Sequence, residues 1–286
     1  MSYRRKHIKT KIYKLRKPKK SILKRPIFWI SFLFLIIVLS FLYIFVFSSI
    51  FQVKNIEVSG NEKIQNKDIQ DFAFVRTGQK IISMGSWHLE SGSIFLVNYK
   101  KINKEILNNF SVIESVKISK KLPQTLTIEI IERKPLGAFC GSSVAVSETN
   151  SPPAKEECFL IDQNGIIFES LSEISDNMII VRKPLDIKQM FTGEKVVAEN
   201  IMGIISKIER NLKDNLQINI EEAIISNPLR LDIKTNENWQ IYFDLDSDVD
   251  MQITKMNLLL NNEISTDARK NLKYVDLRFK DKAYYK

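Results

Sequence analysis

The segment Ser111–Phe139 reads SVIESVKISKKLPQTLTIEIIERKPLGAF, and it carries the pattern of a β-hairpin. Apolar and polar residues alternate on both sides of a central turn, KKLPQ, at residues 120–124. Such alternation places every second side chain on the same face of a strand. We therefore expect two antiparallel strands that share one apolar face, formed by the following residues: Val116, Ile118, Leu126, Ile128 and Ile130.

Two short amphipathic helices are predicted before this hairpin. One covers residues 66–74, and the other begins at an Asn98 cap and continues to about residue 109. A strand is expected at residues 52–59, just before a turn at Gly60–Asn61. The predicted order of this N-terminal domain is therefore β-α-α-β-β.

Residues 79–91, QKIISMGSWHLES, lie between the two predicted helices and are interpreted as an insertion. Met84 and Trp87 in this insertion either contact a partner or the membrane surface, or fold back onto their own domain. His88 is interpreted as a surface residue, because the surrounding Ser and Gly residues indicate an exposed loop.

A long apolar segment precedes these elements. Residues 27–47 read IFWISFLFLIIVLSFLYIFVF, and no charged residue occurs between Arg25 and Lys54. A helix of this length is about 30 Å long, which matches the hydrocarbon core of a bilayer. The segment exceeds the apolar region of a cleaved signal peptide and lacks its small-residue cleavage site. We therefore expect an uncleaved transmembrane helix over residues 27–49.

The first 26 residues form a basic tail. They contain twelve of the 43 Lys and Arg residues and none of the 33 Asp and Glu residues, so the rest of the chain is close to neutral. A basic segment beside a membrane span is typical of the cytoplasmic side and attracts anionic lipid headgroups, here through residues 4–25. We expect a cytoplasmic N-terminus and an exported remainder, and the tail requires no nucleic-acid partner.

The residues after Pro135 predict a second, β-rich domain. Its sheet is expected to be mostly antiparallel with a few helices packed against it, so the fold class is α+β. Two hairpins, two helices and two final strands are predicted at the following residues: 159–168, 229–244, 198–213, 249–262, about 273–279 and 282–286.

The only two cysteines, Cys140 and Cys158, enclose a stretch rich in Ser, Pro and charge at residues 141–157. They are too far apart for a C-x-x-C redox pair, and two histidines are too few to complete a metal site. In an oxidising exported compartment we expect a disulfide at the base of this loop insertion. Two free thiols are the alternative.

The sequence holds no motif typical of catalysis: a G-x-S-x-G elbow, an H-E-x-x-H helix and a phosphate-binding glycine loop are all missing. Asp244, Asp246, Asp248 and Asp250 alternate as in a calcium loop, but Val249 stands at the position that requires glycine. We interpret these aspartates as an exposed helix start. We therefore predict no enzymatic activity, no cofactor and no metal.

Five short sequences outside the apolar segment carry a family resemblance. They are VSGN at 58–61, GSIFLVN at 92–98, the opening segment and especially its stretch Lys121–Pro135, FLIDQNGIIF at 159–168 and YVDLRFKDKAYYK at 274–286. The first three resemble the POTRA domain of the bacterial FtsQ/DivIB division proteins, and the last two resemble the D-x-x-G hairpin and closing strand of that family's β domain. The resemblance implies a POTRA domain at residues 50–134 and an FtsQ-type β domain at residues 135–286.

The resemblance also implies a function. Proteins of this family are non-catalytic scaffolds of the divisome that dock FtsB- and FtsL-type partners and link early division-ring assembly to septal peptidoglycan synthesis. The expected location is the bacterial cytoplasmic membrane at the division septum. The alternative is a POTRA-type chaperone or translocation subunit that binds polypeptides by adding them to a sheet edge.

The last predicted strands are the expected partner-binding site, because an edge strand leaves backbone groups unpaired and invites strand addition. Basic residues in this region, Arg278, Lys280 and Lys282, are expected to attract acidic groups. Phe279 occupies the aromatic position of the D-L-R-aromatic motif, but its alternation with the two preceding apolar residues also predicts a core position. The expected partner-binding residues are as follows: Tyr274, Asp276, Arg278, Phe279, Lys280, Tyr284 and Tyr285.

Overall fold

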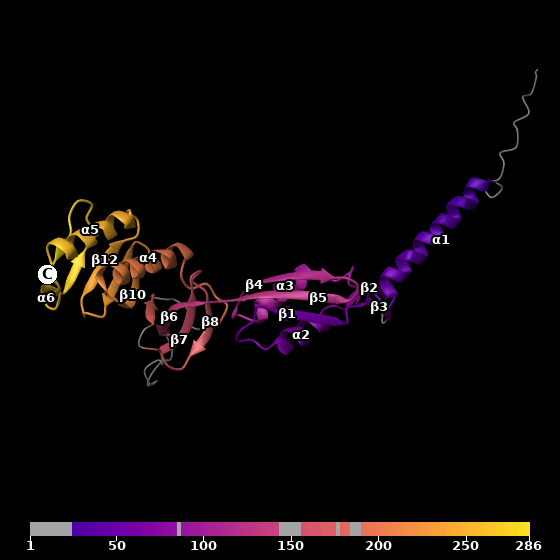
Figure 1. Cartoon of the computed structure of the whole chain (residues 1–286), viewed down its shortest axis with the longest axis horizontal. Coiled ribbons are helices and arrows are strands. Elements are labelled where there is room, and N and C mark those ends of the chain that lie inside the picture. Colours follow the sequence, from indigo (N-terminus) through magenta and orange to yellow (C-terminus); the bar gives the residue numbers. More distant parts are fainter. Residues whose placement is uncertain (1–24, 85–86, 143–155, 176–177, 184–189) are drawn as a thin grey trace, which may run out of the picture.

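The structure is a computed structural model that describes residues 25–84, 87–142, 156–175, 178–183 and 190–286. The chain is elongated, and its three parts follow one another along the long axis (Figure 1). A single helix leads into a small α+β domain, which leads into a larger, β-rich domain.

The apolar helix predicted near the N-terminus is present as α1 (Pro26–Phe47). It begins at a proline, which suits the first turn of a helix because its missing N–H would have no partner there. None of its side chains is buried, and it projects away from both domains (Figure 1). An isolated apolar helix of this kind fits a single-pass membrane protein.

The N-terminal domain packs two helices against a three-stranded sheet with the order β1-β5-β4. β1 pairs in parallel with β5, and β5 pairs with β4 as the predicted antiparallel hairpin. The predicted β-α-α-β-β order is therefore correct, and residues 79–91 add a small hairpin between the helices. The elements are β1 (Asn55–Ser59), α2 (Asn66–Val75), β2 (Gln79–Met84), β3 (Trp87–Ser91), α3 (Tyr99–Asn109), β4 (Ile113–Lys121) and β5 (Thr125–Glu132).

The apolar face of the β4–β5 hairpin forms the core of this domain together with the inner faces of α2 and α3. Asn98 caps α3 as predicted, because its side chain accepts a hydrogen bond from the Lys101 N–H at 3.1 Å. The side chains of residues 79–89, including Met84, Trp87 and His88, lie outside the described part of the structure. The buried core residues from the hairpin and helices are Val116, Leu126, Ile128, Ile130, Ile69, Ala73, Ile102 and Ile106.

The C-terminal domain is built on a nine-stranded sheet with the order β14-β13-β12-β11-β10-β9-β6-β7-β8. In the described part of this sheet, β6–β9, β9–β10 and β12–β13 pair in parallel and the other pairs are antiparallel, so the prediction of a mostly antiparallel sheet is confirmed. Its elements are β6 (Pro135–Ser142), β7 (Glu156–Asp162), β8 (Ile167–Leu171), β9 (Ile179–Arg182), α4 (Glu199–Leu216), β10 (Ile220–Asn227), β11 (Arg230–Thr235), β12 (Gln240–Asp244), α5 (Val249–Asn262), α6 (Thr266–Arg269), β13 (Tyr274–Asp276) and β14 (Tyr284–Tyr285).

α4 and α5 cover one face of this sheet and bury their apolar stripes against it. Trp239 is fully buried in the same core, and its indole N–H donates to Glu237 at 2.9 Å. The structure joins Cys140 and Cys158 by a disulfide between directly opposite positions of β6 and β7. The helical residues buried in this core are Met202, Ile205, Ile208, Leu212, Leu216, Ile253, Met256 and Leu260.

The final strands are shorter than predicted, because side chains form hydrogen bonds with backbone groups that would otherwise pair with a neighbouring strand. β13 ends at Asp276, whose carboxylate accepts the backbone N–H of Arg278 at 3.2 Å. The ammonium group of Lys255 on α5 then donates to the carbonyls of Leu277 and Phe279. The chain regains strand pairing only at β14.

An ion pair between Arg133 and Asp162 joins the two domains. The guanidinium Nη1 lies 2.5 Å from the carboxylate Oδ2, and both side chains are largely buried. Arg133 Nε also donates to the Ser111 carbonyl at 3.0 Å. The other carboxylate oxygen of Asp162 accepts the backbone N–H groups of Asn164 and Ile166, both at 2.9 Å, and so closes the D-x-x-G turn. Residues that carried the family resemblance therefore form the domain joint.

The neighbouring Glu132 fixes a loop of the N-terminal domain. Its carboxylate accepts the backbone N–H groups of residues 62–64 at 3.0 to 3.1 Å. Burial raises the pKa of Glu132, but these three bonds and the charge of Lys63 outweigh it, and the pKa lies below the ordinary value. Gly60 precedes this loop with a φ of +85°, and a Cβ there would lie 2.2 Å from the Ile130 carbonyl oxygen, so the position requires glycine.

Candidate partner-binding edge

β14 lies at one edge of the nine-stranded sheet and pairs on one side with β13. The Lys286 N–H donates to the Tyr274 carbonyl at 3.3 Å and therefore points toward β13. Because backbone groups alternate in direction along a strand, the N–H and carbonyl of Tyr285 point away from the sheet. This edge offers the backbone groups that an added strand needs.

Aromatic side chains stand beside this free backbone. Phe279 and Tyr284 meet edge to face with ring centres 4.9 Å apart, and Phe279 is 49% exposed. Val275 and Leu277, by contrast, are fully buried. The alternation of apolar residues that also predicted a core position for Phe279 ends with β13. The side chain of Phe279 therefore lies on the surface.

Asp276 and Arg278 pair with each other. Arg278 Nε donates to Oδ1 at 2.8 Å, and Nη2 donates to Oδ2 at 2.6 Å. Burial raises the pKa of Asp276, but the bonds and charge of Arg278, together with the charge of Arg230, outweigh it and leave the pKa below its ordinary value. Since the charge of Arg278 is balanced within the protein, the exposed lysines of this edge, which include Lys280, Lys282 and Lys286, carry its unbalanced positive charge.

The structure adds two residues that the sequence analysis did not include. The ring of Tyr242 on β12 stacks on Tyr274 with centres 5.7 Å apart, and the guanidinium of Arg230 lies 4.8 Å from the centre of the Tyr242 ring. Tyr242 lies between the buried residues Ile241 and Phe243 and so points to the opposite face of the sheet. The alternation along β12 was the signal that could have identified this face.

The expected site residues therefore divide into two groups. Tyr274, Asp276 and Arg278 lie together on the sheet face beside Tyr242. The second group consists of exposed residues of the turn and edge strand: Phe279, Lys280, Tyr284 and Tyr285.

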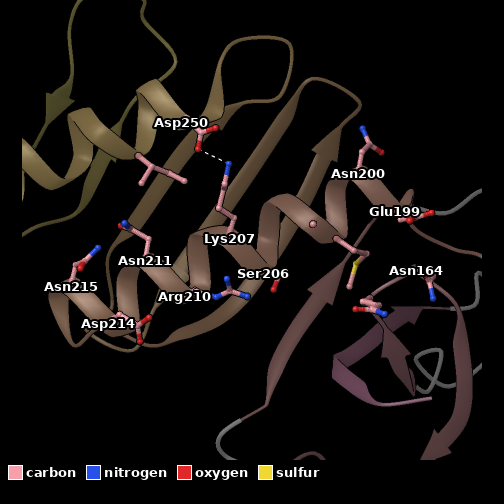
Figure 2. Close-up of a pocket in the computed structure, with 14 residues that line it drawn as sticks. Asn164, Glu199, Asn200, Ser206, Lys207, Arg210, Asn211, Asp214, Asn215 and Asp250 are labelled. Atoms are coloured by element: carbon pink, nitrogen blue, oxygen red, sulfur yellow. Dashed lines mark hydrogen bonds and ion pairs between the residues drawn. The ribbon is translucent and has the colours of Figure 1, made fainter. Parts of the chain in front are cut away.

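A polar groove of about 1040 Å³ lies along α4, beside the start of α5 and the turn at Gln163–Asn164 (Figure 2). Lys207 of α4 reaches across to Asp250 of α5 at 2.5 Å (Figure 2). The lining contains neither histidine nor cysteine. The ion pair between Lys207 and Asp250 joins the two helices across this groove.

The side chains of the alternating aspartates accept hydrogen bonds from nearby backbone N–H groups. Asp248 is the N-cap of α5 and accepts the N–H groups of Asp250 and Met251. Asp244 accepts the N–H of Asp246 at 3.0 Å. These bonds agree with the interpretation of an exposed helix start. Among the residues that the structure describes, no three His, Cys, Asp or Glu side chains are placed to hold a metal ion.

The single apolar helix, the β-α-α-β-β domain and the strand edge define a membrane-anchored POTRA-domain protein. The chain matches the family model "POTRA domain, FtsQ-type" over residues 77–133 and the model "Cell division protein FtsQ/DivIB, C-terminal" over residues 154–278. The chain belongs to the FtsQ/DivIB family of bacterial cell division proteins. The N-terminal domain is accordingly called the POTRA domain below.

Similar curated proteins carry the same family name. Cell division protein DivIB of Clostridium acetobutylicum is 26% identical over 237 residues, which cover 82% of each chain. Cell division protein DivIB of Clostridium botulinum strain Hall is 26% identical over 240 residues, which cover 80% of this chain and 79% of the relative. A role in cell division follows from this family membership.

Proposed function

We propose that this protein is a non-catalytic divisome scaffold that docks FtsB- and FtsL-type division proteins at the free side of β14. The observation that carries the proposal is an edge strand whose outward backbone groups at Tyr285 stand beside the exposed Phe279–Tyr284 pair. Aromatic residues are enriched among those that dominate binding energy. Docking would link early division-ring assembly to septal peptidoglycan synthesis by stabilising an assembly that is competent to activate the synthase.

The proposed topology places both domains outside the cytoplasm, at the division septum. α1 would span the bacterial cytoplasmic membrane once, with the basic tail on the cytoplasmic side. The lipid contact expected for residues 4–25 falls almost entirely outside the described residues and rests on charge alone. This orientation puts the docking edge and the cysteines in the same exported compartment.

The proposed docking mode is strand addition. A partner strand would pair with the outward N–H and carbonyl of Tyr285, and an apolar side chain of the partner would contact Phe279 and Tyr284. Lys280 and Lys282 would favour acidic residues on the partner.

The backbone contribution can be tested in the full chain, reconstituted in nanodiscs with its FtsB- and FtsL-type partners. Tyr285→Pro removes an outward N–H and leaves the bonds to β13 in place. We expect this variant to bind at least about tenfold more weakly than Tyr285→Ala, which loses the ring but keeps the N–H. Equal affinities for the two variants would rule out strand addition at β14.

The side-chain contribution is tested by Phe279→Glu. Its matched control is Phe191→Glu, since Phe191 is 55% exposed in the same domain but lies beside β8, at the opposite edge of the sheet. We expect Phe279→Glu alone to weaken partner binding, by about tenfold or more. Truncation after Leu272 is a poorer test, because it also removes the buried residues Val275 and Leu277.

The alternative function, a POTRA-type chaperone or translocation subunit, would use the same edge for unfolded polypeptides. An unfolded polypeptide that bound the edge as tightly as the division partners, and was displaced by them, would favour this alternative.

A further inference from the structure

The last turn of α1 is hydrogen-bonded to the POTRA domain. Gln52 Nε2 and Ser91 Oγ donate to the carbonyl of Val46 at 3.0 and 2.6 Å, and Ser93 Oγ donates to the carbonyl of Phe45 at 2.6 Å. The last carbonyls of a helix have no partner within the helix, so these side chains act as its C-terminal cap. The POTRA domain therefore begins directly at the end of the apolar helix, without a free linker.

Three phenylalanine rings strengthen this connection. Phe45 of α1 lies 5.2 Å from Phe51 and 5.3 Å from Phe95, and the latter two rings are 5.3 Å apart, all measured between ring centres. Phe95 belongs to the segment between β3 and α3. It therefore lies at the same depth along the helix axis as a residue of the span.

Further apolar side chains surround this cluster on the surface. The turn between β4 and β5 is held at the same end of the domain, because the Lys54 N–H donates to the Gln124 carbonyl at 2.9 Å and Lys120 Nζ donates to the Phe95 carbonyl at 3.4 Å. Figure 1 shows that α1 leaves the domain from this end. The juxtamembrane patch consists of five side chains that are 39% to 59% exposed: Ile50, Phe95, Leu96, Tyr99 and Leu122.

The length of α1 determines where this patch lies. Its 22 residues form a helix of about 33 Å, and the hydrocarbon core of a bilayer is about 30 Å thick. The last turn, and with it Phe95, therefore reaches the boundary between hydrocarbon and headgroups. Aromatic residues favour this zone, and lysines beside them extend their ammonium groups toward water and phosphate. Lys120 is placed in this way, 5.7 Å from the centre of the Tyr99 ring.

We propose that the juxtamembrane patch inserts into the outer interface of the bilayer around α1 and holds the POTRA domain against the lipid. The proposed occupant is lipid because the patch is continuous with the end of the span and contains no charged side chain. The acidic group of Glu57 on the adjacent strand is balanced by Lys121 at 3.1 Å, so it adds no net repulsion toward anionic headgroups. The POTRA domain would then be fixed by two contacts, the helix cap and the patch.

The depth of the patch can be measured in the full chain, one copy per nanodisc of phosphatidylethanolamine and phosphatidylglycerol. A small fluorophore is introduced through an unnatural amino acid at Leu96, at Leu122 or, as control, at Ile131, which is 59% exposed near the joint with the C-terminal domain. We expect lipids with a nitroxide headgroup to quench the first two positions at least about threefold more strongly than the control, and aqueous iodide to do the reverse. Patch positions that behave like Ile131 would overturn the proposal.

A second measurement separates lipid binding from mere proximity to the span. The fluorophore is placed at Tyr99 in the double variant Leu96→Glu and Leu122→Glu, with Ile131→Glu as the matched charge control. We expect the double variant to lower lipid quenching at Tyr99 by at least twofold and Ile131→Glu to leave it unchanged. Unchanged quenching in the double variant would show that the helix cap alone holds the domain near lipid, and would contradict the proposal. Protection of Tyr99 from both quenchers would indicate coverage by protein and would contradict it as well.

Discussion

The carboxylate of Glu132 accepts three consecutive backbone N–H groups, an arrangement that only its ionised form satisfies fully. Its pKa is therefore lower in the folded than in the unfolded protein. The stability that Glu132 contributes is complete above the ordinary pKa of glutamate, about 4.3, and is lost as the pH falls through the lower folded value. Asp276, whose pKa is also lowered in the folded protein, acts in the same direction.

We predict that Glu132→Gln reduces the pH dependence of stability between pH 6 and about pH 3.5. The measurement is the free energy of unfolding in urea at both pH values, with the full chain in mild detergent. Glu129→Gln is the control, since Glu129 lies on the same strand but is exposed and forms a surface ion pair with Lys117. If Glu132→Gln lost stability on acidification as steeply as the wild type, the three backbone bonds would not be the cause.

Single residues also show what the sequence could not reveal. The motif E-R-K-P was recognised from the sequence. The ion pair that its Arg133 forms at the domain joint depends on Asp162, which is 29 residues away in the chain. The position of Phe279 likewise depends on Lys255, which lies on another element. Alternation identifies the face of a strand, and only tertiary contacts determine where the strand stops.

At the level of elements, the disulfide connects β6 and β7 across the base of the 141–157 insertion. Closing a loop of this size removes conformational freedom from the unfolded chain and stabilises the fold by about 3 kcal/mol. We predict no mass shift when the purified protein is alkylated without reductant, and a loss of about 3 kcal/mol of unfolding free energy in the double variant Cys140→Ala and Cys158→Ala. A shift of two alkyl groups in the wild type would show free thiols.

Elements with strong patterns were predicted well and those held by distant partners were not. The β4–β5 hairpin, α4 and α5 follow from local periodicity, and the structure contains them close to the expected residues. β9 was not predicted, because it has four residues and pairs in parallel with β6 and β10, which lie far away in sequence. The hairpin pairing within residues 79–91 was not predicted either.

For the whole molecule, the arrangement of the parts separates the apolar helix from the proposed docking edge. This edge lies at the opposite end of the molecule from α1 (Figure 1). Each connection along this length is fixed by side chains: Gln52, Ser91 and Ser93 at the helix cap, and Arg133 with Asp162 at the domain joint. A scaffold of this kind would present its edge at a set height above the membrane, where partners that are also membrane-anchored could meet it.

The joint provides a test of this rigidity, because two ion pairs of different burial cross it. Arg133–Asp162 is largely buried, whereas the 2.8 Å pair Lys63–Glu169 is exposed on both sides. We predict that Arg133→Ala lowers the free energy of unfolding by about 3 kcal/mol, since it leaves a buried carboxylate unpaired, and that Lys63→Ala lowers it by less than about 1 kcal/mol. Spin labels at exposed positions of the two domains should report a broader distance distribution in Arg133→Ala than in Lys63→Ala. Equal distributions in the two variants would mean that the buried pair stabilises the joint without setting the angle between the domains, and the height of the docking edge would then have to be fixed by other contacts.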